Sequence, residues 1–99
     1  MSTVEPTALI DVLAERRLQD VKWGEQNHDP LTYLCILMEE VGECTQAALH
    51  SRFGGPAADG LRKEAVHVAA VALAIVECLD RQRWEWPGMK VREKPKEVS

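Results

Sequence analysis

The sequence has few aromatic residues, few cysteines and no long hydrophobic run. Aromatic residues make up 5% of the 99 residues, and tryptophan accounts for three of them. The apolar share of 45% therefore comes mostly from Ala, Val and Leu, which favour helices over a β-sandwich. A chain of this length is expected to form one domain, with a radius of gyration of about 13 Å if it folds alone.

The charge, the short apolar runs and the cysteine count also argue against several kinds of function. The formal net charge of −4 argues against nucleic-acid binding, which requires a basic face for the phosphates. The longest apolar run, Val68–Val76, is too short to span a bilayer, and the polar N-terminus resembles no secretory signal. Since Cys35, Cys44 and Cys78 are odd in number and lie in apolar contexts, we expect free, reduced, buried thiols in a cytoplasmic protein.

Apolar periodicity and capping signals predict three long helices and an all-α fold. Asp29 followed by Pro30 is a typical N-cap with proline at the first helical position, so the second helix begins there. Gly54 and Gly55 end that helix, because glycine readily takes the left-handed conformation that follows a helix. The first two helices are predicted to span about 7–23 and 30–52, and the third to begin within 57–61 and end near 83.

The third helix is apolar nearly all round. From Ala65 to Leu79 only His67 and Glu77 interrupt the apolar residues, and a helix of this kind is expected to be surrounded by protein. Because two other helices cannot easily enclose it, we expect a homo-oligomer, either a dimer or a tetramer. Residues 1–88 are expected to form the helical domain, with a short turn or strand near 84–89, and 89–99 a charged, mobile tail.

Two pairs of candidate ligands indicate a metal site. Glu40 and Glu43 are three residues apart and so lie about one turn apart on one helix face, and Glu64 and His67 have the same spacing on the third helix. Facing side chains of this kind build divalent-metal sites in helical bundles, and carboxylates suit Mg²⁺ or Mn²⁺. The alternative is that these residues are simply solvated.

The arrangement resembles a known family. "EEVGE" at 39–43 followed by "EAVH" at 64–67 is similar to the EExxE…ExxD signature of the MazG-like all-α nucleoside triphosphate pyrophosphohydrolases. The segments "QDVKWGEQNHDPLTYLCILMEEVGE" and "LRKEAVHVAAVALAIVECLDR" extend the resemblance over residues 19–81. It implies a four-helix core completed by dimerisation and hydrolysis of a nucleoside triphosphate to a monophosphate and pyrophosphate.

By this resemblance Glu40, Glu43 and Glu64 would bind Mg²⁺, and Glu39 or Glu43 would take a proton from the attacking water. The family's last Asp is His67 here, and imidazole is a better ligand for Mn²⁺, Zn²⁺ or Ni²⁺ than for Mg²⁺. His67 therefore either ligates a softer metal, lies outside the ligand set as a hydrogen-bonded core residue, or marks a protein that has lost hydrolysis. In the last case the chain would be a dimer that binds nucleotide or a protein partner.

A substrate pocket is predicted near the second helix. Trp23 would stack on the base while Asn27 and His28 read its edges, as the resemblance also implies; alternatively Trp23 closes the end of the bundle and the other two hold the turn. Lys63 is a candidate for contact with the phosphates. Other basic residues are equally available for that contact: Arg62, Arg81, Arg83 and Lys90.

Overall fold

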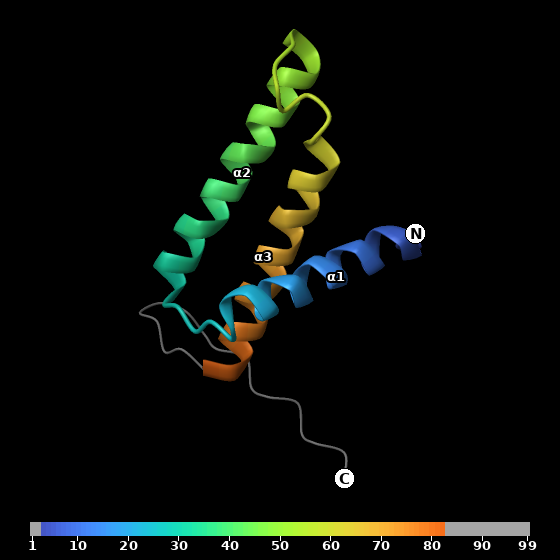
Figure 1. Ribbon diagram of the computed structural model, residues 1–99. Coiled ribbons are helices and arrows are strands. Elements are labelled where there is room, and N and C mark those ends of the chain that lie inside the picture. The colour runs from blue at the N-terminus through green and yellow to red at the C-terminus, as the bar shows by residue number, and fades with distance from the viewer. Residues whose placement is uncertain (1–2, 83–99) are drawn as a thin grey trace.

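The described part of the chain consists of three helices. The computed structural model describes residues 3–82. Within this range it contains α1 (Pro6–Trp23), α2 (Pro30–Phe53) and α3 (Leu61–Gln82), and no strand (Figure 1). The all-α prediction and the three predicted spans are confirmed. The turn or strand expected near 84–89 and the tail 89–99 lie outside the described residues.

The ends of α1 and α2 are set by short-range signals. Asp29 caps α2 by accepting hydrogen bonds from the Thr32 backbone N–H (3.0 Å) and the Thr32 hydroxyl (2.7 Å). Gly24, with φ of 72°, ends α1, and Gly54, with φ of 92°, ends α2. Each of these glycines donates its N–H to the carbonyl four residues earlier, at 2.8 Å. Positive φ costs little at glycine, which explains why the helices end there.

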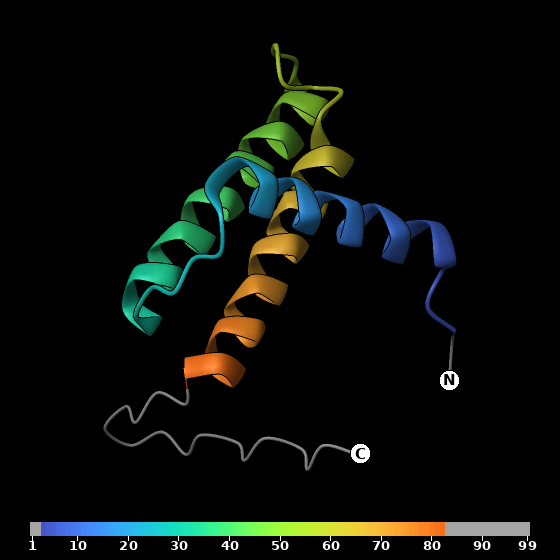
Figure 2. The same ribbon diagram turned by 60° about the horizontal axis from the view of Figure 1, so that its bottom comes forward.

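The helix α3 is the common partner of the other two. It runs antiparallel to α2 in a helical hairpin, while α1 crosses α3 steeply (Figures 1 and 2). Among residues 3–82, α1 and α2 each pack on α3, and the backbones of α1 and α2 do not approach one another. Side chains from all three helices therefore meet over the surface of α3.

A buried arginine holds α1 on α3. Arg16 is 8% exposed and donates from Nε to Glu77 on α3 (2.7 Å) and from Nη1 to Asp20 on α1 (2.6 Å). Burial alone would lower the pKa of Arg16, but the hydrogen bonds to Asp20 and Glu77 and the negative charges of these two residues together outweigh it, and the pKa is raised. A charged hydrogen-bonded pair of this kind has demanding geometry, so it fixes how α1 lies on α3.

The buried core of the single chain is small. Its apolar members lie on α2 and α3: Tyr33, Ala47, Ala70, Val71, Ala74 and Cys78. An apolar stripe on α1 is exposed, because α1 turns its Arg16 side towards α3. The members of this stripe are Leu9, Ile10, Leu13, Leu18 and Val21.

One expectation about burial agrees with the structure and one needs correction. As expected, the third helix is not enclosed within the single chain, since Val76 is 54% exposed. Cys78 is buried as expected, but Cys44 is only partly buried and Cys35 is exposed, although all three thiols are free. The radius of gyration of 16.0 Å exceeds the roughly 13 Å of a compact chain of this length, so the fold is more open than predicted.

No helix within residues 3–82 is both long enough and apolar enough to cross a membrane.

The turn between α2 and α3 provides a stability test. Gly55 has φ of 151°, and a Cβ there would collide with the His50 ring, whose Nδ1 accepts the Ala57 N–H at 3.1 Å. We expect Gly55→Ala to lower the free energy of unfolding by about 1–3 kcal/mol through backbone strain. Thermal melts followed by circular dichroism measure this change.

The matched control is Gly42→Ala, because Gly42 lies inside α2 and a Cβ there meets nothing within 4 Å. This substitution should raise stability by about 0.5–1 kcal/mol, the usual advantage of Ala over Gly in a helix. Equal melting temperatures for the two variants would contradict the strained geometry of the turn.

Candidate metal centre

Three side chains from two helices converge on one point. Glu40 on α2 faces Glu64 and His67 on α3, and one ligand atom from each lies within 4.8 Å of the others. His67 Nδ1 is 3.5 Å from Glu64 Oε2 and 3.9 Å from Glu40 Oε2. Three of the predicted metal ligands are therefore adjacent, although they come from positions up to 27 residues apart in the chain.

Local helix geometry accounts for the α3 side of this cluster. Glu64 and His67 are one turn apart at the start of α3, where Glu64 belongs to the first turn. The N-terminal end of a helix favours a negative charge, so Glu64 is well accommodated there. The antiparallel hairpin of α2 and α3 is visible in Figure 1. Glu40, near the middle of α2, lies within 3.9 Å of His67 in this turn.

Two carboxylate oxygens in the cluster have no hydrogen-bond partner. Glu40 Oε2 and Glu64 Oε2 are both buried, and neither accepts a hydrogen bond from any described residue. An unsatisfied buried polar atom costs roughly 1–3 kcal/mol, and more if charged. These are the same two atoms that face His67 Nδ1, so the site contains acceptors directed at a common point.

A further carboxylate approaches from α1. Glu15 Oε1 lies 3.4 Å from Nε2 of His67, on the other side of the ring from Glu40 and Glu64. The imidazole therefore lies between carboxylates on both sides. Its Nε2 faces Glu15, and its Nδ1 faces Glu40 and Glu64. The crossing of α1 over α3 brings Glu15 to this position.

The environment makes ionisation of Glu40 less favourable than in water. Burial raises the pKa of Glu40, and the charge of Glu43 raises it further; His67 opposes these effects, while Glu64 and Glu15 add to them. Proximity of like charges in a partly desolvated site has this effect on a carboxyl group. A bound cation would reverse it.

The donor set fits a divalent cation. Two ligands at about 2.1 Å from one ion are at most about 4.2 Å apart, so a small side-chain rotation closes the observed 4.8 Å separation. Carboxylate oxygens suit Mg²⁺ and Mn²⁺, and an imidazole nitrogen favours transition metals. The residues that would hold the ion are Glu40, Glu64 and His67.

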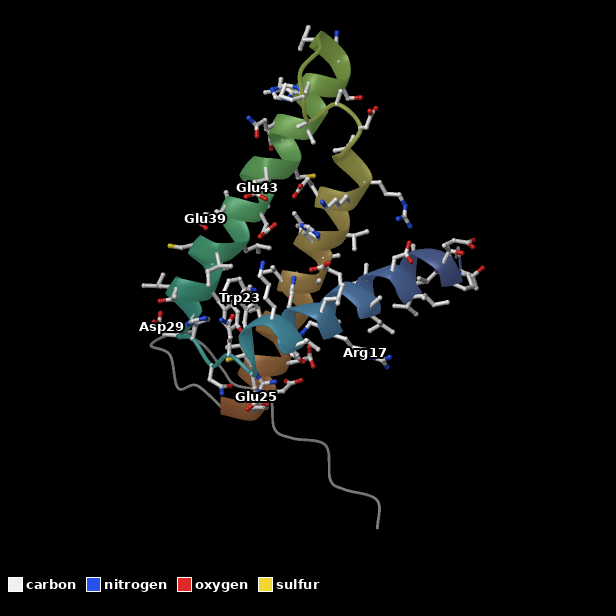
Figure 3. All side chains as sticks on the ribbon, in the orientation of Figure 1. Arg17, Trp23, Glu25, Asp29, Glu39 and Glu43 are labelled. Atoms are coloured by element: carbon white, nitrogen blue, oxygen red, sulfur yellow. The ribbon has the colours of Figure 1, made fainter. Side chains whose placement is uncertain are left out.

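Glu39 and Glu43 lie outside this cluster. Both are exposed, and Glu39 lies on the side of α2 away from α3 (Figure 3). Glu43 is close enough to affect the pKa of Glu40 but contributes no atom to the cluster. Within one chain, the predicted Glu40–Glu43 pair is therefore divided between an interhelical groove and solvent.

A hollow beside Glu40 contains the predicted stacking residue. It has a volume of about 90 Å³ and is lined by Trp23, Arg16, Tyr33, Glu40 and residues around them. Trp23 lies at the end of α1, near α2 (Figure 3), and is 60% exposed. Small-molecule pockets are typically about 300–1,000 Å³, so this hollow alone is too small for a nucleotide.

Asn27 and His28 have structural contacts in the α1–α2 loop. The Asn27 side-chain oxygen accepts hydrogen bonds from Arg81 at 3.1 and 3.2 Å. The His28 ring packs edge-on against Tyr33, with centroids 4.9 Å apart. These contacts match the alternative in which both residues hold the turn, and neither residue lines the hollow beside Glu40.

Lys63 lies at a second hollow, on the opposite side of His67. This space of about 280 Å³ is lined by Glu15, Lys63, His67 and neighbouring residues of α1 and α3. Arg62, in the same lining, is paired with Asp11 at 2.7 Å. Lys63 forms no ion pair within residues 3–82 and remains available for an anion.

The sequence reasoning missed Glu15 and Arg16. Apolar periodicity alone places both residues on the polar face of the first helix, which would be expected to face solvent. A buried Arg16 was not signalled by periodicity, and the contact of Glu15 with His67 depends on the helix crossing. The polar side of α1 faces α3, and this orientation becomes evident only from the structure, in which the apolar side of the helix is exposed.

Comparison of the chain with protein-family models, with curated proteins and with solved structures finds no match.

The raised pKa of Glu40 predicts a pH-dependent stability. A carboxyl whose pKa is higher in the folded chain than in the unfolded chain destabilises the fold as pH rises through that folded pKa. In EDTA at pH 7, Glu40→Gln should therefore be more stable than the unmodified protein by about 1 kcal/mol. The difference should vanish below about pH 4, where the carboxyl is protonated in both states.

Thermal melts at pH 7 and pH 4 measure this effect. The exposed neighbour provides the control, because Glu39→Gln should change stability by less than about 0.5 kcal/mol at either pH. A Glu40→Gln variant that is less stable than the unmodified protein in EDTA would show that the carboxylate is not strained.

Proposed function

We propose that the protein is a metal-dependent nucleoside triphosphate pyrophosphohydrolase of the MazG-like kind. The observation that carries this proposal is the cluster of Glu40, Glu64 and His67, in which two buried carboxylate oxygens lack partners. An all-helical chain with carboxylates at these positions resembles that family in both motif spacing and helix content. We further propose that it acts in the cytoplasm, in keeping with its three free thiols.

The proposed cofactor is Mg²⁺ or Mn²⁺, held by Glu40, Glu64 and His67. When bound, such an ion neutralises phosphate charge and lowers the pKa of a coordinated water. Glu43, one turn from Glu40 and exposed, is available to accept a proton from the attacking water, with Glu39 as the other candidate. General-base catalysis of this kind contributes typically 10²–10⁴-fold.

The two hollows suggest how a nucleotide would lie. The base would stack on Trp23 beside Glu40, where the lining also includes the aromatic ring of Tyr33. Lys63, on the other side of the cluster, is a cation for the phosphates. Asn27 is an available polar group only if the Arg81 contact opens, and His28 only if its ring leaves Tyr33.

The competing function is a nucleotide- or protein-binding protein that has lost hydrolysis. The observation favouring it is that Glu39 and Glu43 are exposed and contribute nothing to the cluster in one chain. The presence of His67 where the family has Asp points the same way. Retention of Glu40 and Glu64 as adjacent, buried acceptors favours the enzyme.

A pyrophosphate-release assay across ribo- and deoxynucleoside triphosphates, with Mg²⁺ and with Mn²⁺, tests the proposed reaction. We expect activity with at least one nucleotide, and a loss of roughly 100-fold or more in Glu40→Gln and Glu64→Gln, because each removes charge from the metal site. Glu5→Gln is the control, since Glu5 is exposed and makes no capping hydrogen bond.

Two further variants separate the alternatives. Activity that is unchanged in Glu43→Gln would exclude Glu43 as the base. If the unmodified protein has no activity and His67→Asp has activity, the protein is a binding protein that has lost hydrolysis.

We also propose that the active unit is a homodimer. The apolar stripe on α1 and the small core of the single chain leave large side chains exposed, including Ile10 at 63%. Burying such surface is the main favourable term in association. A second chain would complete a four-helix core and could supply walls that the small hollow beside Glu40 lacks.

Light scattering after gel filtration tests this state. We expect a mass of about twice the 11.1 kDa of one chain. Ile10→Glu should shift the protein towards monomer, because it buries a charge in the interface. Ser51→Glu, which adds the same charge at an exposed position of α2, should remain dimeric. A monomeric unmodified protein at micromolar concentration would contradict the proposal.

A further inference from the structure

His67 presents different nitrogens to two sets of carboxylates. Nδ1 faces the unpartnered oxygens of Glu64 (3.5 Å) and Glu40 (3.9 Å), whereas Nε2 faces Glu15 (3.4 Å). A neutral imidazole carries a proton on one nitrogen and a lone pair on the other. The nitrogen that donates to a carboxylate therefore determines which nitrogen can bind a metal.

The three carboxylates are not equivalent as acceptors. Glu40 and Glu64 contribute the atoms that cluster as ligands, and Glu15 does not belong to that cluster. Metal-binding histidines usually donate their other N–H to a carboxylate, carbonyl or water, which fixes the tautomer and the ring orientation. Glu15 is on the correct side of the ring for that role, and the 3.4 Å separation closes to a hydrogen bond by a small rotation.

We propose that Glu15 is a positioning residue that accepts the Nε2–H of His67, directs its Nδ1 lone pair between Glu40 and Glu64, and so makes the site selective for Mn²⁺ over Mg²⁺. The selectivity follows from the ligand type, because imidazole suits first-row transition metals and Mg²⁺ prefers oxygen. The proposal rests on the metal centre of the proposed function and requires no particular reaction.

The fold gives independent support for this role of Glu15. Its neighbour Arg16 is buried and bound to Glu77 on α3, so the backbone of α1 at residue 15 is held against the same helix that carries His67. Glu15 itself is only 22% exposed in its side chain, and His67 25%. Positioning groups act best from rigid elements, and this contact joins two helices.

Metal titrations in the absence of nucleotide test the proposal. Manganese binding is measured from the loss of the electron paramagnetic resonance signal of free Mn²⁺, and Mg²⁺ binding by its competition with Mn²⁺. We expect tighter binding of Mn²⁺ than of Mg²⁺, and a loss of roughly tenfold or more in Mn²⁺ affinity in Glu15→Ala. Glu15→Gln, which keeps a side-chain oxygen acceptor, should restore part of that affinity.

The control variant separates positioning from charge. Asp11→Ala removes a carboxylate from α1 that pairs with Arg62 in the same hollow and does not contact His67. It should weaken the binding of Mn²⁺ and of Mg²⁺ by similar, small factors. If Glu15→Ala also weakens the binding of both metals by equal factors, Glu15 acts only through charge and the proposal is wrong. Binding of Mg²⁺ as tight as that of Mn²⁺ in the unmodified protein would also overturn it.

A spectroscopic measurement reports the tautomer directly. The ¹⁵N chemical shifts of His67 in the metal-free protein, at a pH where the ring is neutral, should correspond to a proton on Nε2. In Glu15→Ala they should move towards a mixture of both tautomers. A proton on Nδ1 in the unmodified protein would contradict the proposal.

The outcomes also distinguish this inference from the proposed function. Mn²⁺ selectivity that depends on Glu15, without pyrophosphate release, would leave the inference intact and refute the enzyme. Pyrophosphate release with equal binding of both metals would support the enzyme and refute the inference about Glu15. Binding of neither metal would refute both.

Discussion

The ion pair between Arg16 and Glu77 is the constraint on which the site depends. Because the backbones of α1 and α2 do not approach one another among the described residues, the orientation of α1 depends mainly on its contacts with α3. A buried guanidinium needs its carboxylate partners in fixed geometry, and the partner on α3 determines how α1 crosses. That crossing brings Glu15 to His67 and, two turns later, Trp23 to the hollow beside Glu40.

Charge balance explains why such a site would bind a cation. Glu15, Glu40 and Glu64 all face one imidazole, so even a protonated His67 leaves an excess of negative charge. The raised pKa of Glu40 is one consequence of this excess together with burial. Helices can bring carboxylates together only at an energetic cost, and a divalent cation offsets that cost more completely than protonation of a single group.

The sequence predicted those features that depend on a few neighbouring residues. The Asp29 cap, the Gly54 stop and the proximity of Glu64 to His67 follow from contacts within four residues, and the hairpin that brings Glu40 to them follows from two antiparallel helices. The sequence could not predict the burial of Arg16, because this depends on the crossing of α1. Nor could it separate Glu40 from Glu43: positions three apart differ by about 60° around a helix, which is enough to move one side chain from the groove into solvent.

An imidazole at position 67 is compatible with Glu15 in a way that a carboxylate is not. A carboxylate at position 67 would face Glu15 with no proton to share, and the two like charges would repel each other. An imidazole has a donor for Glu15 and a lone pair for the centre of the site. His67 on α3 and Glu15 on α1 therefore form a complementary pair. Such a pair is what a metal ligand and the carboxylate that orients it require.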